Sequence, residues 1–212
     1  RIWRTDVTAH PFASKTTTRR NRDALIAAGW GVMISPTGCG LDTDGFSRVA
    51  LDNGAWTFFQ KGLPFDETLF RKTLEHVGHR VDWCVAPDIV CGGDESLALS
   101  MRWLPRCLDE CQQVLIAVQN GMEPHQFEHI VGPRIGVFVG GDTRWKEDTM
   151  ADWGGLGLRT GCTVHVGRVN TMRRIALCNA ARVSSFDGTS ASKYNVTLPK
   201  LDNARKQSAF NF

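Results

Sequence analysis

The feature that most constrains this chain is a series of short apolar segments, each ending in a polar residue or glycine. They occupy residues 30–35, 49–52, 83–88, 114–119, 135–140, 163–167 and 183–187. Continuous apolar runs of this length are typical of strands buried on both faces of a parallel sheet. Between them, apolar residues recur at helical spacing over 65–76, 94–112 and 171–181. This alternation predicts an α/β fold built on a parallel sheet.

Seven or eight strand–helix units in 212 residues predict a compact (β/α)8 TIM-like barrel, complete or incomplete, near the lower size limit of that fold. A doubly wound open sheet is the alternative. No repeat or linker divides the sequence, so we expect one catalytic domain over 1–212. Within it we expect a basic N-terminal arm over 1–28 and a polar, loosely packed C-terminal tail over 197–212. The arm would carry Lys15, Arg19, Arg20 and Arg22.

Composition limits the class of protein. Hydrophobic residues make up 42% of the chain, enough for a substantial core, and the net charge of +3 permits a polyanionic partner without requiring one. Several of the seven cysteines lie inside apolar runs and form no disulfide ladder, which favours a reducing, cytoplasmic setting. No stretch approaches the roughly 20 apolar residues that a membrane span needs, so we expect no membrane partner.

Polar groups or glycines follow the ends of six consecutive predicted strands. These are Asp52, Asp88, Gln119, Gly140–Gly141, Gly167–Arg168 and Asp187. In a barrel the carboxyl ends of the strands form the face where active sites are built. Taken singly, each aspartate is as readily explained as a helix cap. The set as a whole predicts a site.

Convergent carboxylates suit glycosyl transfer, because one can attack the anomeric carbon while another moves the proton of the departing group. The amide of Gln119 offers a donor and an acceptor to a purine edge. Gly140 and Gly141 would let a flat base approach the backbone. Spacing alone leaves Asp52 and Asp187 interchangeable in their roles.

The ordered set of segments resembles the tRNA-guanine transglycosylase superfamily. The resemblance is greatest to its DNA-acting branch, the phage and bacterial enzymes that insert 7-deazaguanines into DNA. The matching segments cover roughly residues 49 to 193 in the family's order. They are Leu51-Asp52-Asn53-Gly54-Ala55-Trp56, Ala86-Pro87-Asp88-Ile89-Val90, Val118-Gln119-Asn120-Gly121-Met122, Phe138-Val139-Gly140-Gly141, His165-Val166-Gly167-Arg168-Val169-Asn170 and Ser185-Phe186-Asp187-Gly188.

The resemblance implies a role for each matching position. Asp187 would be the covalent nucleophile and Asp52 the general acid/base. The base would be bound by Asp88, Gln119, the backbone of Gly140 and Gly141, and a pocket wall made of Val166 and Gly167. It also implies a barrel fold, no required cofactor, a free 7-deazaguanine base as co-substrate, and the host cytoplasm as the location if the chain is phage-encoded.

Two departures from the family pattern affect the expected partner. The sequence has no Cys-x-Cys-x-x-Cys segment and ends soon after Asp187, so either the zinc subdomain is absent or scattered ligands replace it, and we expect no structural zinc. Because that subdomain helps to hold tRNA in the family, its loss favours DNA. Asn53 stands where the family usually has Ser. Transglycosylation on tRNA is the alternative activity, and a non-catalytic nucleic-acid-binding relative is the alternative class, although retention of Asp52 and Asp187 speaks against it.

Basic residues follow two of the strand ends. We expect Arg144, Lys146 and Arg168 to rim the mouth of the barrel and contact the nucleic-acid backbone. Flipping a base out of duplex DNA would leave a gap, which Trp56 or Trp145 is placed to fill if it is exposed.

Three rival patterns are weaker. His125-Gln126-Phe127-Glu128-His129 matches the H-x-x-E-H zinc motif, but it is confined between prolines and lacks an evident third ligand. Residues 155–160 approach a dinucleotide-binding turn but lack its last glycine and do not follow a strand. Cys107 and Cys111 share a helical face with apolar neighbours, which favours core packing over metal binding.

Overall fold

A closed barrel of eight parallel strands forms the centre of the protein in the computed structural model, which describes residues 8–38, 40–193 and 196–207. Strands that follow one another in the sequence are neighbours in the barrel. Closure comes from β8 (Ser185–Gly188), which pairs with β1 (His10–Ser14) and aligns Asp187 with Phe12. The predicted TIM-like barrel is therefore confirmed, whereas the alternatives of an incomplete barrel and an open sheet are wrong.

The remaining strands match the predicted apolar segments to within a few residues. They are β2 (Gly31–Ile34), β3 (Val49–Leu51), β4 (Trp83–Val85), β5 (Val114–Val118), β6 (Ile135–Val139) and β7 (Val164–Val166). The structure adds β1, which the sequence pattern did not predict.

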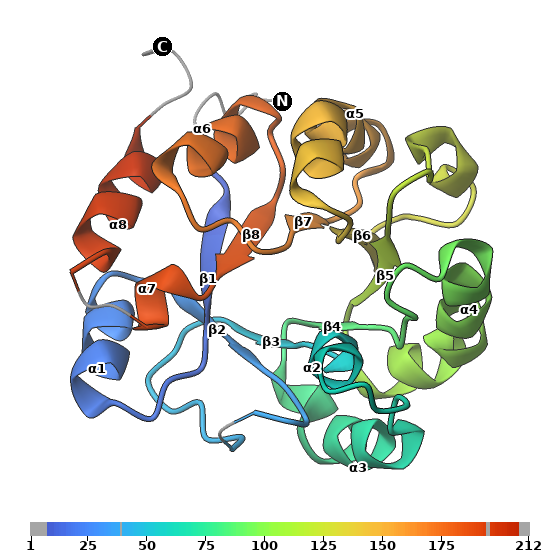
Figure 1. Ribbon diagram of the computed structural model, residues 1–212, viewed down its shortest axis with the longest axis horizontal. Helices are drawn as coiled ribbons and strands as arrows, with labels where there is room; N and C mark the ends of the chain where they lie inside the picture. The colour runs from blue at the N-terminus through green and yellow to red at the C-terminus, as the bar shows by residue number, and fades with distance from the viewer. Residues whose placement is uncertain (1–7, 39, 194–195, 208–212) are drawn as a thin grey trace.

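Helices surround the barrel on its outside (Figure 1). They are α1 (Arg19–Ala27), α2 (Ala55–Gln60), α3 (Glu67–Val77), α4 (Gly93–Glu110), α5 (Thr143–Thr160), α6 (Met172–Ala180), α7 (Ser190–Lys193) and α8 (Leu198–Lys206), with short 3-10 turns η1 (Gly78–Arg80) and η2 (Pro124–Phe127). Side-chain caps begin three of them. Asp66, Asp142 and Thr171 accept hydrogen bonds from backbone N–H groups in the first turns of α3, α5 and α6.

Two separate cores hold the barrel together. A large outer core lies between strands and helices and includes Val164, Val166 and Phe186. A small inner core fills the barrel itself, and its members are Phe12, Met33, Ala50, Trp83, Val85, Leu115 and Ala117, with Phe138 packed against them. The alternation of side chains along each strand distributes residues between the two cores.

The two predicted terminal appendages are wrong within the described residues. Residues 8–28 are not an arm, since they include β1, which closes the barrel, and α1; residues 1–7 lie outside the described part. The C-terminal segment is not a loose tail either. Helix α8 buries Leu198 and Leu201, and Asp202 accepts a 2.9 Å hydrogen bond from Nε1 of the buried Trp30. Residues 208–212 lie outside the described part.

Candidate active site

A cavity of about 1040 Å³ opens at the carboxyl ends of the strands. Its lining brings together predicted site residues that are as far as 135 positions apart in the sequence: Asp52, Asp88, Gln119, Gly140, Gly141, Arg168 and Asp187. These residues follow or end β3, β4, β5, β6, β7 and β8, so the convergence results from the parallel direction of the strands.

Asp52 lies in the tight connection between β3 and α2. Gly54 has φ +83°, a left-handed conformation suited to glycine, and its N–H donates to Oδ2 of Asp52 at 3.2 Å. Burial raises the pKa of Asp52 from 3.8 to about 7, and the negative charges of Asp187 and Asp88 act in the same direction. Near neutral pH this carboxyl can therefore both give and take a proton.

Asp88 is held from two sides by amide groups. Its Oδ1 accepts from Nδ2 of Asn53 at 2.8 Å, and its Oδ2 accepts from Nε2 of Gln119 at 3.0 Å. Asn53 also donates to the carbonyl oxygen of Ala86 at 2.7 Å, which ties the end of β3 to the end of β4. Burial raises the pKa of Asp88, and the two amide donors oppose this effect.

Gln119 lines the cavity and carries one unsatisfied polar atom. Its Nε2 lies within hydrogen-bonding distance of Asp88 Oδ2, the carbonyl oxygen of Ile89 and Oγ of Ser96. Its Oε1 is buried and has no hydrogen-bond partner among the residues that the structure describes. Buried polar atoms are normally paired, so this oxygen favours a ligand that brings an N–H or O–H donor.

Asp187, only 7% exposed, is also positioned by its surroundings. Its Oδ1 accepts from the backbone N–H of Arg168 at 3.1 Å and lies 3.2 Å from Nε2 of His165. The other ring nitrogen of His165, Nδ1, lies 2.8 Å from Oγ of Ser185. Burial lowers the pKa of His165, and the neighbouring Asp187 opposes that effect.

The two glycines after β6 shape the mouth of the cavity. Gly140 donates its N–H to the carbonyl oxygen of Val118 at 2.9 Å, so this N–H is already used by the sheet. Gly141 has φ +45°, and a β-carbon there would lie 2.3 Å from the ring of Trp145. The packing of Trp145 therefore requires a residue without a side chain at position 141.

The expected pocket wall of Val166 and Gly167 is wrong, because neither residue lines the cavity. Val166 is fully buried in the outer core, facing the helices rather than the cavity. Gly167, one position further, faces inward, because a β-carbon there would lie 2.8 Å from the ring of Phe138 and 3.4 Å from Oδ1 of Asp187. The strand's alternation separates the two neighbours.

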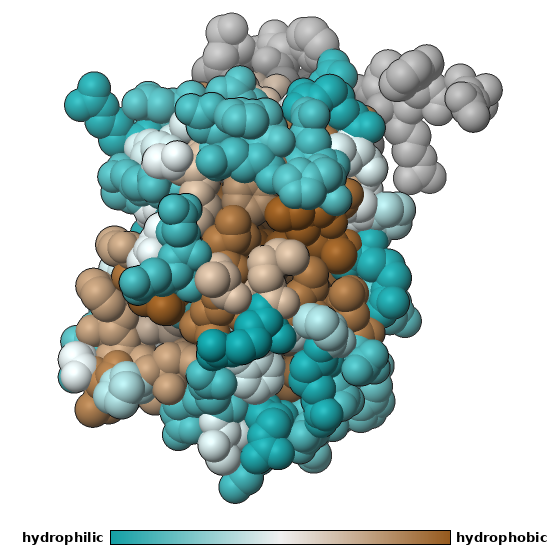
Figure 2. Space-filling view, turned by 90° about the vertical axis from the view of Figure 1, so that its right-hand side faces the viewer, coloured by the Kyte–Doolittle hydropathy of each residue, from teal (hydrophilic) through white to brown (hydrophobic). Residues whose placement is uncertain are grey.

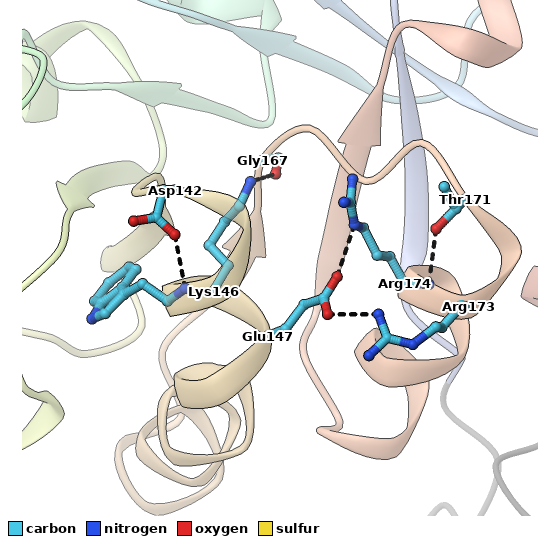
Figure 3. Close-up of polar contacts among 8 residues, drawn as sticks. Asp142, Lys146, Glu147, Gly167, Thr171, Arg173 and Arg174 are labelled. Carbon is cyan, nitrogen blue, oxygen red and sulfur yellow. Dashed lines mark hydrogen bonds and ion pairs between the residues drawn. The ribbon is translucent and has the colours of Figure 1, made fainter.

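Lys146 is not at the predicted rim. It is 5% exposed, and its Nζ donates to the carbonyl oxygen of Gly167 (Figure 3). Burial and then the charge of Arg168 lower the pKa of Lys146 from 10.5 to about 8. A buried ammonium group committed to a backbone carbonyl is not available to a phosphate, so Lys146 supports the end of β7 instead.

The other basic residues differ in their access to the cavity. Arg144 is exposed and pairs with Asp148 at 3.7 Å, and it does not line the cavity. Arg168 does line it, with Nη2 donating to the carbonyl oxygen of Gly141 at 2.6 Å. Arg173 and Arg174 both bind Glu147, at 2.6 and 2.9 Å, between α5 and α6 (Figure 3).

The two tryptophans considered for the gap left by a flipped base are unlike one another. Trp56 on α2 lines the cavity and is 40% exposed, and the guanidinium of Arg168 lies 4.5 Å from its ring centre. Trp145 is half-buried and packs against Trp153, with ring centres 6.2 Å apart. Only Trp56 lines the cavity.

An apolar surface adjoins the cavity. A second depression, of about 570 Å³, lies between α2 and α4 and shares Asp88 and Val90 with the main cavity. Phe59, Leu63 and Ile89 line it and are all substantially exposed. Figure 2 shows hydrophobic residues gathered over a broad area of the side on which α4 lies in Figure 1.

The rival sequence patterns fall in places that do not suit their chemistry. The H-x-x-E-H segment forms the 3-10 turn η2 and the turn after it, where His125 pairs with Glu123 and Glu128 pairs with Arg159. Residues 155–160 lie inside α5, not in a strand-to-helix turn. Cys107 and Cys111 are buried in the outer core. Over residues 8–38, 40–193 and 196–207, no group of three or more His, Cys, Asp or Glu side chains is arranged to hold a metal ion.

Three residues that shape this site were not predicted from the sequence. His165 and Ser185 hold Asp187, and Ser96 on α4 bridges Gln119 and the backbone of Ile89. His165 and Ser185 occupy inward positions of adjacent predicted strands, which is a usable signal. Ser96 carries no signal, because a serine in the first turns of a helix is common.

Comparisons with known proteins identify the fold alone. No protein-family model matches the chain, and a search of curated proteins finds no relative. Among solved structures, the chain is similar to a crystal structure of tryptophan synthase from M. tuberculosis in its aminoacrylate-bound form. The TM-score is 0.54 with 14% sequence identity, over 95% of this chain and 92% of that one. Within the described residues, no helix has both the length and the apolar character needed to cross a lipid bilayer.

Proposed function

We propose that this protein is a pentosyltransferase that replaces guanine in DNA with a 7-deazaguanine derivative through a covalent glycosyl-aspartate intermediate. One observation carries the proposal. Three carboxylates from three strands share one cavity with an amide, and one of them, Asp52, has a pKa of about 7 while Asp187 lies close enough to raise it. A nucleophile and a separate group able to exchange a proton at neutral pH are what retaining glycosyl transfer needs.

In the first half-reaction, a carboxylate oxygen of Asp187 attacks C1′ of the target deoxyguanosine. The bond from C1′ to N9 breaks, and its electron pair leaves with the base. Protonated Asp52 gives its proton to the departing guanine and becomes a carboxylate. Because the pKa of Asp52 is about 7, the protonated form is well populated near neutral pH.

The second half-reaction reverses these roles. The 7-deazaguanine passes its N9 proton to the Asp52 carboxylate, and N9 attacks C1′. The bond between C1′ and the Asp187 oxygen breaks, returning its electron pair to the carboxylate. Both catalytic groups end in their starting states, so no cofactor takes part in this proposed cycle.

Recognition of the base falls to Asp88 and Gln119. The buried, unpaired Oε1 of Gln119 can accept a hydrogen bond from a purine N–H. Asp88 is fixed by its two amide donors, which gives it a defined direction towards the cavity. Arg168, on the cavity wall and stacked on Trp56, is placed to meet a phosphate near the flipped nucleotide.

The proposal is tested by trapping the intermediate. The protein is incubated with guanine-containing DNA or with tRNA, denatured, and run on a gel that separates covalent adducts from free chain. We expect an adduct with DNA that Asp187→Ala abolishes and that Asp109→Ala, a change of the same charge at an exposed position on α4, leaves intact. An adduct with tRNA alone would transfer the activity to tRNA. Absence of an adduct with either nucleic acid would overturn the enzymatic proposal and favour a non-catalytic binding protein.

A further inference from the structure

We propose that His165, supported by Ser185, is a positioning residue that fixes Oδ1 of Asp187 and thereby leaves Oδ2 as the oxygen that attacks the sugar. This inference rests on the proposed function, because it takes the attack of Asp187 on the sugar as the reaction. The hydrogen-bond arrangement itself is independent of it.

The ring of His165 is confined on several sides inside the barrel. It is fully buried and stacks on Phe138, with ring centres 5.0 Å apart and an interplanar angle of 23°. Trp83 lies 4.7 Å and Phe12 lies 5.9 Å from it, centre to centre. With aromatic rings packed around it, the imidazole has little freedom to turn, so its two nitrogens have fixed directions.

The direction of each hydrogen bond follows from the acceptor chemistry. An ionised carboxylate can only accept, so Nε2 of His165 must carry the proton that points to Asp187 Oδ1, 3.2 Å away. Burial lowers the pKa of His165, which favours the neutral ring with a single N–H. Nδ1 is then an acceptor, and the hydroxyl of Ser185 donates to it at 2.8 Å. Because His165 is aligned with Ser185 in the pairing of β7 and β8, the barrel itself sets this contact.

A second donor reaches the same oxygen. The backbone N–H of Arg168 donates to Oδ1 at 3.1 Å, and Arg168 holds φ +60°, a left-handed conformation uncommon in residues other than glycine. A strained backbone at such a place is consistent with a geometric requirement there. Both donors lie on Oδ1, and in the described part of the chain no hydrogen bond is formed to Oδ2. Since Asp187 lines the cavity, Oδ2 is the oxygen left to react.

The expected consequence is kinetic. A carboxylate held at one oxygen presents the other in a fixed direction, whereas a released carboxylate samples many orientations, and small misplacements of a reacting group cost about 100-fold in rate. Removing the His165 donor should therefore slow adduct formation by roughly 10- to 100-fold. Affinity for the nucleic acid should stay within about twofold, because the buried ring does not reach the cavity surface.

The test compares His165→Phe, which keeps an aromatic ring but removes both nitrogens, with His165→Gln, whose amide nitrogen can reach the place of Nε2. Single-turnover adduct formation is measured at saturating DNA, and DNA affinity is measured separately. We expect His165→Phe to lose rate without losing affinity, His165→Gln to recover part of the rate, and Ser185→Ala to show a smaller loss. Nitrogen-15 NMR of the wild-type protein should place the His165 proton on Nε2.

The outcomes separate this inference from the proposed function. Wild-type adduct formation with an unchanged rate in His165→Phe would overturn the positioning role alone. A proton on Nδ1 in the NMR spectrum would overturn it independently of any reaction and of how well the variants fold. Absence of an adduct in the wild type would overturn both the proposed function and the role built on it.

Discussion

Replacing Asp52 by Asn should stabilise the protein in a pH-dependent way. In the folded state the pKa of Asp52 is about 7 rather than 3.8, so the unfolded chain releases this proton at lower pH than the folded chain. Between these values the folded state binds more protons, and the stability of the wild type falls as the pH rises. One pKa unit corresponds to about 1.4 kcal/mol, so the full cost of ionising Asp52 is about 4 kcal/mol.

Asp52 is half-buried at the wall of an open cavity, so solvent should screen part of its charge, and we expect an observed difference of roughly 2 to 4 kcal/mol. The free energies of unfolding in urea of wild type and Asp52→Asn should agree near pH 4. They should diverge up to about pH 7 and remain separated above it, with the variant more stable. Other groups titrate in this window, but they are common to both proteins and largely cancel in the difference.

Asp109→Asn, which removes the same charge from the exposed surface of α4, serves as the control and should show a difference of less than about 0.5 kcal/mol at every pH. A difference between wild type and Asp52→Asn that does not change with pH would refute the reasoning. A wild type more stable than Asp52→Asn at pH 8 would refute it as well, because the carboxylate would then be stabilised by its site.

Two further predictions concern the support of the barrel. An alanine methyl at Gly154 would lie 1.8 Å from the carbonyl oxygen of Ala181, so Gly154→Ala should cost about 3 kcal/mol in urea unfolding. A methyl at its neighbour Gly155 would meet only the flexible end of Arg159, at 3.3 Å, so Gly155→Ala should stabilise the protein by about 0.5 to 1 kcal/mol. Similar changes in unfolding free energy for both variants would contradict this packing. Burial lowers the pKa of Lys146 to about 8 from 10.5, so from pH 8 to 10.5 the wild type should gain roughly 1 to 3 kcal/mol relative to Lys146→Met. If the unfolding free energies of the two proteins depend equally on pH, the Lys146 ammonium is exposed to water and the prediction is wrong.

The barrel could be predicted because five of its strands, β2 to β6, are continuous apolar runs, and such runs follow directly from burial on both faces. The apolar character of β7 and β8 is weaker, because His165 interrupts β7 and Phe186 is the one large apolar side chain of β8. The strand β1 escaped this reasoning. Its sequence, His10-Pro11-Phe12-Ala13-Ser14, has three buried residues between two partly exposed ends. One of the buried residues is Pro11, and proline is unusual inside a sheet. What makes β1 a strand is closure, since it pairs with β2 on one side and β8 on the other. That is a tertiary effect that no local pattern records.

The convergence of the site could also be predicted, because the ends of parallel strands meet on one face whatever the intervening helices do. Orientation of single side chains could not. Whether Val166 or Gly167 faces the inside of the barrel depends on a register of one residue. Lys146 was predicted at the rim from its position after β6, but the rotation of α5 turns it inward to Gly167 and leaves Arg144 in solvent. Such rotations are set by packing between helices and strands, which the sequence specifies only collectively.

The inner core links the fold to the unusual protonation of the site. Phe12, Trp83 and Phe138 close the barrel below the cavity, and His165 packs against all three. This arrangement excludes water beneath the carboxylates, and exclusion of water disfavours every charged form. The same burial therefore raises the pKa of Asp52 and lowers that of His165. A neutral histidine can give Asp187 a hydrogen bond without giving it a neutralising positive charge. In the proposed reaction, the aromatic layer thus serves both roles, because it positions the Asp187 nucleophile through His165 and lets Asp52 hold its proton near neutral pH.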